Sequence, residues 1–262
     1  MAFQIGIRVE RDSGPLLTEI ASLVDYVLLE FHPQAPLSPW QLYTLDSLEK
    51  SRAVTLHGFH SLSTPGVFTQ EAIDRIQEAV DRSGASWYSE HICFALTNEA
   101  GSDIVTLAAP LDEQTLQIVC ENAVGLKNRL SVPLLLENLG RPVIWPWDDI
   151  DEIDAIHQIG NRTGCKLVLD LAQAATSAHT RGQPLLDYVA SYPGDSIHEI
   201  HIGPEGEGKE LGEEYLGALH ALLRAGEIQA VTVEGAERDH LIAQRCIEQL
   251  RDLRDQQAER KK

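Results

Sequence analysis

Short apolar runs bounded by turn residues recur along the whole chain, and eight of them have the length of a β-strand. They read FQIGIRV, VDYVLLEF, AVTLHGF, SWYSEHICF, PLLLENL, CKLVLDL, SIHEIHIG and AVTVEGA. Most of these runs are nearly continuous in apolar residues rather than alternating with polar ones. This pattern is typical of strands that are buried on both faces, as in a parallel sheet.

Helical patterns separate most of the strand-like runs. Residues 69–84 place their apolar side chains on one face of a helix. Another helix is predicted to begin at Ser38, with Ser38 as N-cap residue, Pro39 in the first turn and Gln41 as the capping-box partner. Eight strands that alternate with helices predict an α/β fold, a closed (β/α)₈ TIM barrel.

Several of the apolar runs end on a residue that can bind a metal or transfer a proton. In a TIM barrel the carboxyl ends of all the strands meet at one mouth, where active sites are built. Side chains that end different strands should therefore converge there. The residues at these positions are Glu30, His57, His91, Glu137, Asp170, His201 and Glu234.

Length and composition limit the class of protein. A chain of 262 residues is long enough for one barrel, so we expect a single domain over residues 1–262 with a short charged tail from about residue 251. A net charge of −19 without a basic stripe argues against nucleic acid as a partner. No apolar run is long enough to cross a membrane, and the N-terminal residues do not resemble a signal peptide, which predicts a cytoplasmic protein.

The candidate residues at the mouth are histidines and carboxylates, a set of N and O donors that suits Zn²⁺, Mn²⁺ or iron. The four cysteines are scattered, so a thiolate metal site is not indicated. Side-chain alternation along a strand selects His201 over His198, and it separates His91 from Glu90. A single strand-end carboxylate often only caps the next helix, but convergence of several such residues favours a metal site.

Five segments, in this order, resemble one known family: HGFHSLS, SEHICF, PLLLENLG, LVLDLAQAATSAH and HEIHIG. The family is that of the multinuclear non-haem iron-dependent oxidative enzymes, and its metal scheme is shared with the wider xylose-isomerase-like barrels. The resemblance implies a TIM barrel with two or three irons near its mouth. It also implies O₂-dependent modification of cysteine or other residues in a ribosomal peptide, often presented by a partner protein.

The resemblance assigns residues to two metals. His57, His91 and Glu137 would bind the first, and Glu137, Asp170, His201 and Glu234 the second, so that Glu137 bridges both. Other residues are expected to contact the ligands or the substrate. These are Glu30, Glu90, Asn138, Gln173, His179 and Glu205.

A third metal of the trinuclear relatives would lack its ligands in this chain. A His or Asn is expected three residues after Asp170, where Gln173 stands, and no Asp-x-His motif follows the seventh strand. We therefore expect a dinuclear centre. Within the acidic segment 205–214, Glu205, Glu213 or Glu214 could supply a substitute carboxylate.

Three functions are compatible with these residues. The first is a di-iron oxidoreductase that modifies a peptide, at cysteine or another residue, in natural-product-type peptide maturation; Mn or Zn are alternative metals. The second is a sugar isomerase or epimerase, in which one ion and paired glutamates move a proton beside a carbonyl. The third is a barrel that has lost catalysis and binds a partner. The complete pair His57 and His91 favours the oxidative enzyme.

Overall fold

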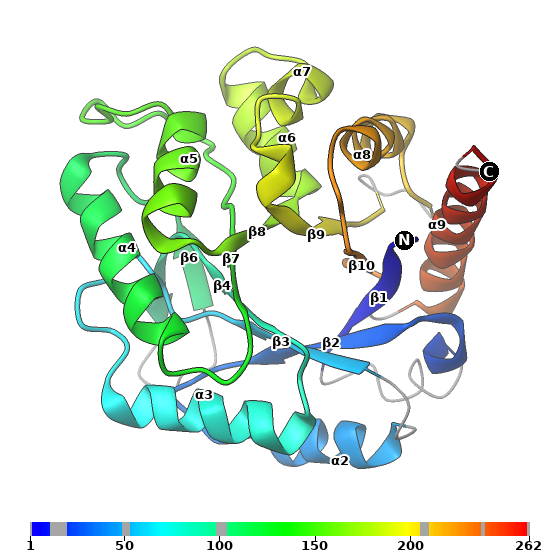
Figure 1. Ribbon diagram of the computed structural model, residues 1–262, viewed down its shortest axis with the longest axis horizontal. Helices are drawn as coiled ribbons and strands as arrows, with labels where there is room; N and C mark the ends of the chain where they lie inside the picture. The colour runs from blue at the N-terminus through cyan, green and yellow to red at the C-terminus, as the bar shows by residue number, and fades with distance from the viewer. Residues whose placement is uncertain are drawn as a thin grey trace.

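The computed structural model describes residues 2–10, 20–48, 53–97, 104–204, 210–236 and 239–260. Within them, eight strands form a closed barrel in the order β1-β10-β9-β8-β7-β4-β3-β2, and each neighbouring pair is parallel. Figure 1 shows this ring of strands at the centre and the helices around it. The predicted (β/α)₈ barrel is thus confirmed.

The eight barrel strands correspond to the eight apolar runs of the sequence. They are β1 (Gln4–Val9), β2 (Tyr26–Phe31), β3 (Ala53–Gly58), β4 (Tyr88–His91), β7 (Leu134–Glu137), β8 (Lys166–Asp170), β9 (Ile197–Ile202) and β10 (Ala230–Val233). The α-helices are α2 (Pro39–Ser47), α3 (Gln70–Ser83), α4 (Glu113–Lys127), α5 (Glu152–Thr163), α6 (Leu171–Thr180), α7 (Leu185–Val189), α8 (Glu213–Ala225) and α9 (His240–Arg260). The described residues also form two short 3₁₀ turns, η1 (Ala21–Leu23) and η2 (Gly194–Ser196).

The helix ends follow the local sequence signals. Ser38 caps α2 with the predicted capping box, since its backbone N–H donates to Gln41 Oε1 at 2.7 Å and its side chain accepts from Gln41 N. α3 begins after Thr69, which caps it, and ends at Gly84, whose φ of 63° is a left-handed conformation that suits glycine.

Buried apolar side chains of the described residues form three clusters. The larger core lies between the strands and the helices, and a smaller cluster of Tyr26, Trp87, Leu135, Val168 and Ala230 fills the barrel interior; a third, minor cluster is formed by Cys93, Ala108 and Leu139. We call this smaller cluster the barrel plug. A Cβ at Gly6 would lie 2.3 Å from the Tyr26 ring, so glycine is required there for the ring to occupy the interior. The barrel is therefore a packed core below its mouth.

One connection at the mouth differs from the prediction. The apolar run SWYSEHICF predicts a single strand that continues past His91. Instead β4 ends at His91, and an antiparallel pair follows, formed by β5 (Phe94–Thr97) and β6 (Ile104–Leu107). No helix in the described segments is long and apolar enough to cross a bilayer.

Candidate metal centre

The residues that end the barrel strands come together at the mouth, as the sequence predicts. Two sets of side chains place potential ligand atoms within 4.8 Å of one another. The first group is His57, His91 and Glu137, and the second group is Glu137, Asp170 and His201. All five side chains are buried. Glu137 belongs to both groups, which is the position expected of a bridging ligand.

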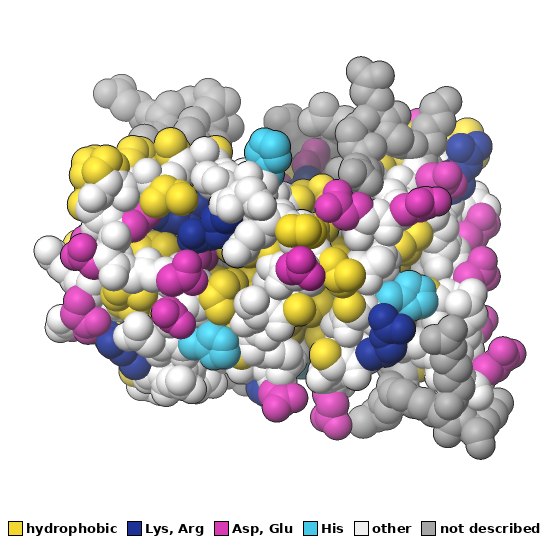
Figure 2. Space-filling model, turned by 90° about the horizontal axis from the view of Figure 1, so that it is seen from above, with side chains coloured by type: hydrophobic (Ala, Val, Ile, Leu, Met, Phe, Trp, Pro, Cys, Tyr) yellow, Lys and Arg dark blue, Asp and Glu magenta, His cyan; other side chains and the backbone are white. Residues whose placement is uncertain are grey.

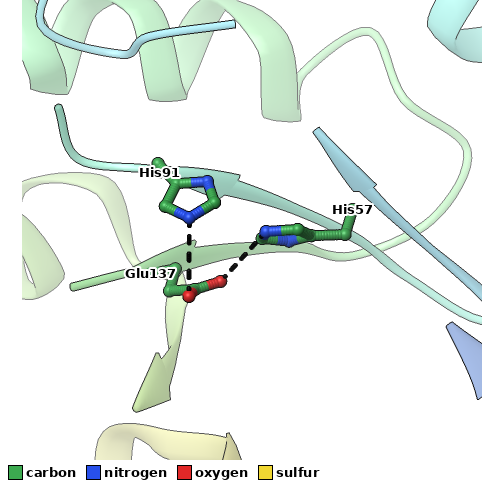
Figure 3. Close-up of side chains that lie close together, drawn as sticks. All are labelled: His57, His91 and Glu137. Atoms are coloured by element: carbon green, nitrogen blue, oxygen red, sulfur yellow. Dashed lines mark ion pairs between the residues drawn. The ribbon is translucent and has the colours of Figure 1, made fainter. Parts of the chain in front are cut away.

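The carboxylate of Glu137 lies between the histidines of both groups. Its Oε1 is 3.5 Å from His91 Nε2, and its Oε2 is 3.3 Å from His57 Nε2 and 3.5 Å from His201 Nδ1. Figure 3 shows His91 and His57 directed at the two oxygens of this carboxylate. These separations leave space for an ion between each nitrogen and oxygen, since metal–ligand bonds are about 2.0–2.3 Å long.

Glu234, the last of the six predicted ligands, follows β10 and lies beside the second group. Its Oε1 is 3.1 Å from His201 Nδ1. Asp170 has two roles, because it ends β8 and is also the N-cap residue of α6, where its Oδ1 accepts from Gln173 N at 2.6 Å. The helix-cap explanation and the ligand explanation of this carboxylate are therefore compatible.

The electrostatics of the site reflect crowded carboxylates and buried imidazoles. Burial and the neighbouring Glu234 and Glu137 raise the pKa of Asp170 to about 7. Burial lowers the pKa of His57 to about 3. Burial alone would raise the pKa of Glu137, but the imidazoles of His91, His57 and His201 outweigh it and lower this pKa to about 2. The neutral His57 and the ionised Glu137 are in the protonation states that metal binding requires, whereas Glu234, Glu137 and Glu199 outweigh burial and raise the pKa of His201.

The hydrogen-bonding pattern also fits metal binding. Among the described residues, Glu137 Oε2, Glu234 Oε1 and both ring nitrogens of His201 are buried without a well-aligned hydrogen bond. Buried polar atoms without partners are costly in a folded protein. A cation between these atoms would satisfy Glu137, Glu234 and His201 Nδ1 together, so the residues present fit a metal centre.

Two further predicted residues support the ligands rather than join them. Asn138 pairs with the backbone of Asp170, accepting from its N–H at 2.8 Å and donating to its carbonyl at 3.2 Å. Gln173 Oε1 accepts from Gly140 N at 2.8 Å, so its amide joins α6 to the β7–α5 loop. Both side chains hold the carboxyl ends of β7 and β8 in place.

The remaining predicted residues lie outside the two groups. Glu30 forms an ion pair with Arg8 at 3.3 Å. The carboxylate of Glu90 accepts hydrogen bonds from Tyr88 Oη at 2.9 Å and from two backbone N–H groups. These bonds use both of its oxygens within the protein. His179 is exposed in the last turn of α6, far along the helix from Asp170, and the structure does not bring it to the centre. Glu205 lies outside the described residues.

Some residues at the site were not identified from the sequence. Arg8 is the last but one residue of β1, and its guanidinium donates to Glu234 Oε2 at 3.4 Å, so it partly neutralises the negative charge at the mouth. Ser89 Oγ is 2.7 Å from His57 Nδ1. The Phe59 ring stacks on His91 at a centroid distance of 4.9 Å. Strand parity could have indicated Ser89, which precedes His91 by two residues on the same face.

The rim of the mouth carries exposed apolar side chains next to acidic ones. Val143, Ile144 and Trp147, in the loop between β7 and α5, are each about half exposed, and Trp147 stacks on Trp145 with an interplanar angle of 8°. Figure 2 shows hydrophobic side chains gathered at the left of its view, where this loop lies, with Asp and Glu side chains around them. Exposed apolar clusters with a polar rim are typical of surfaces that bind another molecule.

Solved structures with the same fold include sugar epimerases. The chain is similar to L-ribulose 3-epimerase, with a TM-score of 0.66 and 12% identity over 99% of this chain and 96% of that one. It is also similar to D-allulose 3-epimerase from Methylomonas sp., with a TM-score of 0.61 and 12% identity over 89% and 84% of the two chains. At this identity the likeness extends to the fold alone.

Relatives with more similar sequences include UPF0276 proteins. A UPF0276 protein of Caulobacter vibrioides is 29% identical over 171 residues, which cover 65% of this chain and 61% of the relative. A UPF0276 protein of Paraburkholderia phytofirmans is 28% identical over 176 residues, or 66% of this chain and 56% of the relative. The match thus spans about three fifths of these relatives' length. The family model of the RiPP precursor modification enzymes MbnB/TglH/ChrH matches residues 5–221, and the chain, with its ligand-bearing barrel mouth, belongs to that family.

Proposed function

We propose that the protein is a di-iron oxidative enzyme that modifies a ribosomally made precursor peptide. The observation that carries this proposal is the position of Glu137 in both ligand groups. Its carboxylate faces His91 through one oxygen, and His57 and His201 through the other. A single-ion site has no need for both groups, whereas two adjacent ions would share this carboxylate.

The donor set supports iron. Imidazole and carboxylate ligands without thiolates suit iron, manganese or zinc, and mixed His/carboxylate sites with open positions are typical of non-haem iron oxygenases. When bound, two irons would supply O₂ activation and the redox change that oxidation of a thiol or carbon requires. The protein's own residues hold the ligands: Ser89 orients His57, and Asn138 and the cap of α6 orient Asp170.

The family and the rim support a peptide substrate. The family is named for modification of RiPP precursors. The exposed apolar side chains of Val143, Ile144 and Trp147 at the rim offer contacts for apolar side chains of a peptide. A partner protein that presents the peptide would bind at the same rim.

A sugar epimerase is the main alternative, because the fold is shared with such enzymes. That activity needs one ion held by Glu137, Asp170, His201 and Glu234, and leaves the pair His57 and His91 without a ligand role. The buried, preoriented rings of this pair, at a centroid distance of 4.5 Å, favour the dinuclear enzyme.

Metal analysis of anaerobically purified protein tests the proposal. We expect about two irons per chain, falling to about one in His91→Ala, and a mass change in a cysteine-containing precursor peptide incubated with the iron-loaded protein and O₂. One manganese per chain, unchanged in His91→Ala, together with turnover of a ketose, would establish the epimerase instead.

A further inference from the structure

A fully buried carboxylate lies in the barrel below the second group. Glu199 precedes His201 by two residues in β9, so both side chains point into the barrel, and neither has exposed surface. Trp87 Nε1 donates to Glu199 Oε2 at 2.8 Å. The hydroxyls of Tyr26 and Thr232 both donate to Glu199 Oε1. These donors come from β2, β10 and the segment that leads into β4, and they fix the orientation of the carboxylate.

The same carboxylate also faces the histidine of the second group. Glu199 Oε1 is 3.3 Å from His201 Nε2. On the other side of the ring, His201 Nδ1 is 3.1 Å from Glu234 Oε1 and 3.5 Å from Glu137 Oε2. The imidazole therefore stands between a carboxylate below it and the ligand carboxylates above it.

A neutral imidazole has one N–H and one lone pair, and the partner of one nitrogen decides which nitrogen carries the proton. Glu199 can only accept, so a lone pair on Nε2 would face negative charge. With the proton on Nε2, the Nδ1 lone pair is directed at the space between Glu137 and Glu234. We propose that Glu199 is a positioning residue that holds His201 as the Nε2–H tautomer, so that His201 binds metal through Nδ1.

This inference rests on the proposed metal centre and adds a difference between its two groups. In the first group, His57 Nδ1 lies 2.7 Å from Ser89 Oγ and His91 Nδ1 lies 3.2 Å from the Gly58 carbonyl. Both rings therefore present Nε2 to Glu137. The first group uses Nε2 and neutral acceptors, and the second uses Nδ1 and a carboxylate acceptor, which strengthens the basicity of its histidine.

Nuclear magnetic resonance of the Zn²⁺-loaded protein tests the assignment without any substitution. Zn²⁺ is diamagnetic, and long-range ¹H–¹⁵N correlations identify which ring nitrogen carries hydrogen. We expect Nδ1–H on His57 and His91 and Nε2–H on His201, so the first two rings serve as internal controls. Zn²⁺ bound with Nδ1–H on His201 would overturn the inference, whereas wild-type protein that binds no Zn²⁺, Mn²⁺ or Fe²⁺ would overturn the metal centre itself.

A matched pair of variants separates positioning from general stability. Glu199→Gln keeps the size but places an N–H₂ toward either His201 or Trp87, because an amide has only one oxygen. We expect 10–100-fold weaker binding of the ion at the second group, with the first ion retained. Ser89→Ala should produce the opposite pattern. The positioning role would be contradicted if Glu199→Gln bound both ions as tightly as wild type does. It would also be contradicted if Glu199→Gln lost both ions to the same extent.

Discussion

Replacing Asp170 by Asn should make the metal-free protein more stable at neutral pH. Asparagine keeps the N-cap of α6, since Asn and Asp are about equally good at this position. The bonds from Asn138 go to the backbone of residue 170 and survive the change. What is removed is a buried negative charge beside Glu234 and Glu137.

The magnitude follows from the pKa of this carboxyl, which burial and its two neighbours raise from 3.8 to about 7. Each pKa unit corresponds to about 1.4 kcal/mol, so ionisation of Asp170 costs the metal-free wild type on the order of 4 kcal/mol above pH 7. Because the pKa in the folded state is the higher one, the wild type has its full stability below about pH 4, where Asp170 is protonated in both states. This stability is lost progressively as the pH rises toward 7, because ionisation of Asp170 is easier in the unfolded state.

Urea unfolding of chelator-treated wild type and Asp170→Asn, at several pH values from 4 to 8, measures this difference. The variant should be more stable by a few kcal/mol at pH 8, and the two proteins should converge as the pH falls to 4. With added metal the wild type should become the more stable protein, because only the wild type keeps the negative charge of Asp170 as a metal ligand. A variant that is less stable than wild type at pH 8 without metal would refute the reasoning.

Further expectations concern the number of ions and the role of the rim. Glu137→Gln should weaken both ions together, whereas His91→Ala should remove mainly the ion of the first group; equal loss in both variants would contradict the two-group description. No third ion is expected beside Gln173, whose amide oxygen is occupied by Gly140, and an anomalous peak there after soaking in excess Fe²⁺ would contradict this. Trp147→Ala should raise KM for a peptide several-fold at unchanged metal content, and an unaffected KM would exclude the rim from binding.

Strand periodicity was enough to predict the barrel and the convergence at its mouth. The sequence alone shows that apolar runs end in Glu137, Asp170 or His201. Because all strands of a parallel barrel end at the same mouth, these side chains are predicted to converge there. Alternation also selected His201 over His198, and the structure directs His201 toward Glu137 while His198 packs on Trp87.

The contacts that orient the ligands could not be read from the sequence in the same way. Glu199 shares a face with His201, but its donors Tyr26, Trp87 and Thr232 come from distant parts of the chain and meet it only after barrel closure. The β5–β6 pair was missed because its strands are short and the connecting residues are polar, so periodicity gave no signal. His179 lies in a motif that resembles the family, yet a helix carries it away from the mouth.

The barrel plug determines how anything can reach the centre. Tyr26 and Trp87 close the barrel interior below Glu199, with almost no exposed surface, so the described side chains leave the mouth as the route of exchange. Ions, O₂ and substrate would then share one entrance. Metal must therefore bind before a peptide covers the rim. A bound peptide would also slow the release of metal to a chelator, which would make the loaded enzyme most resistant to demetallation while its substrate is in place.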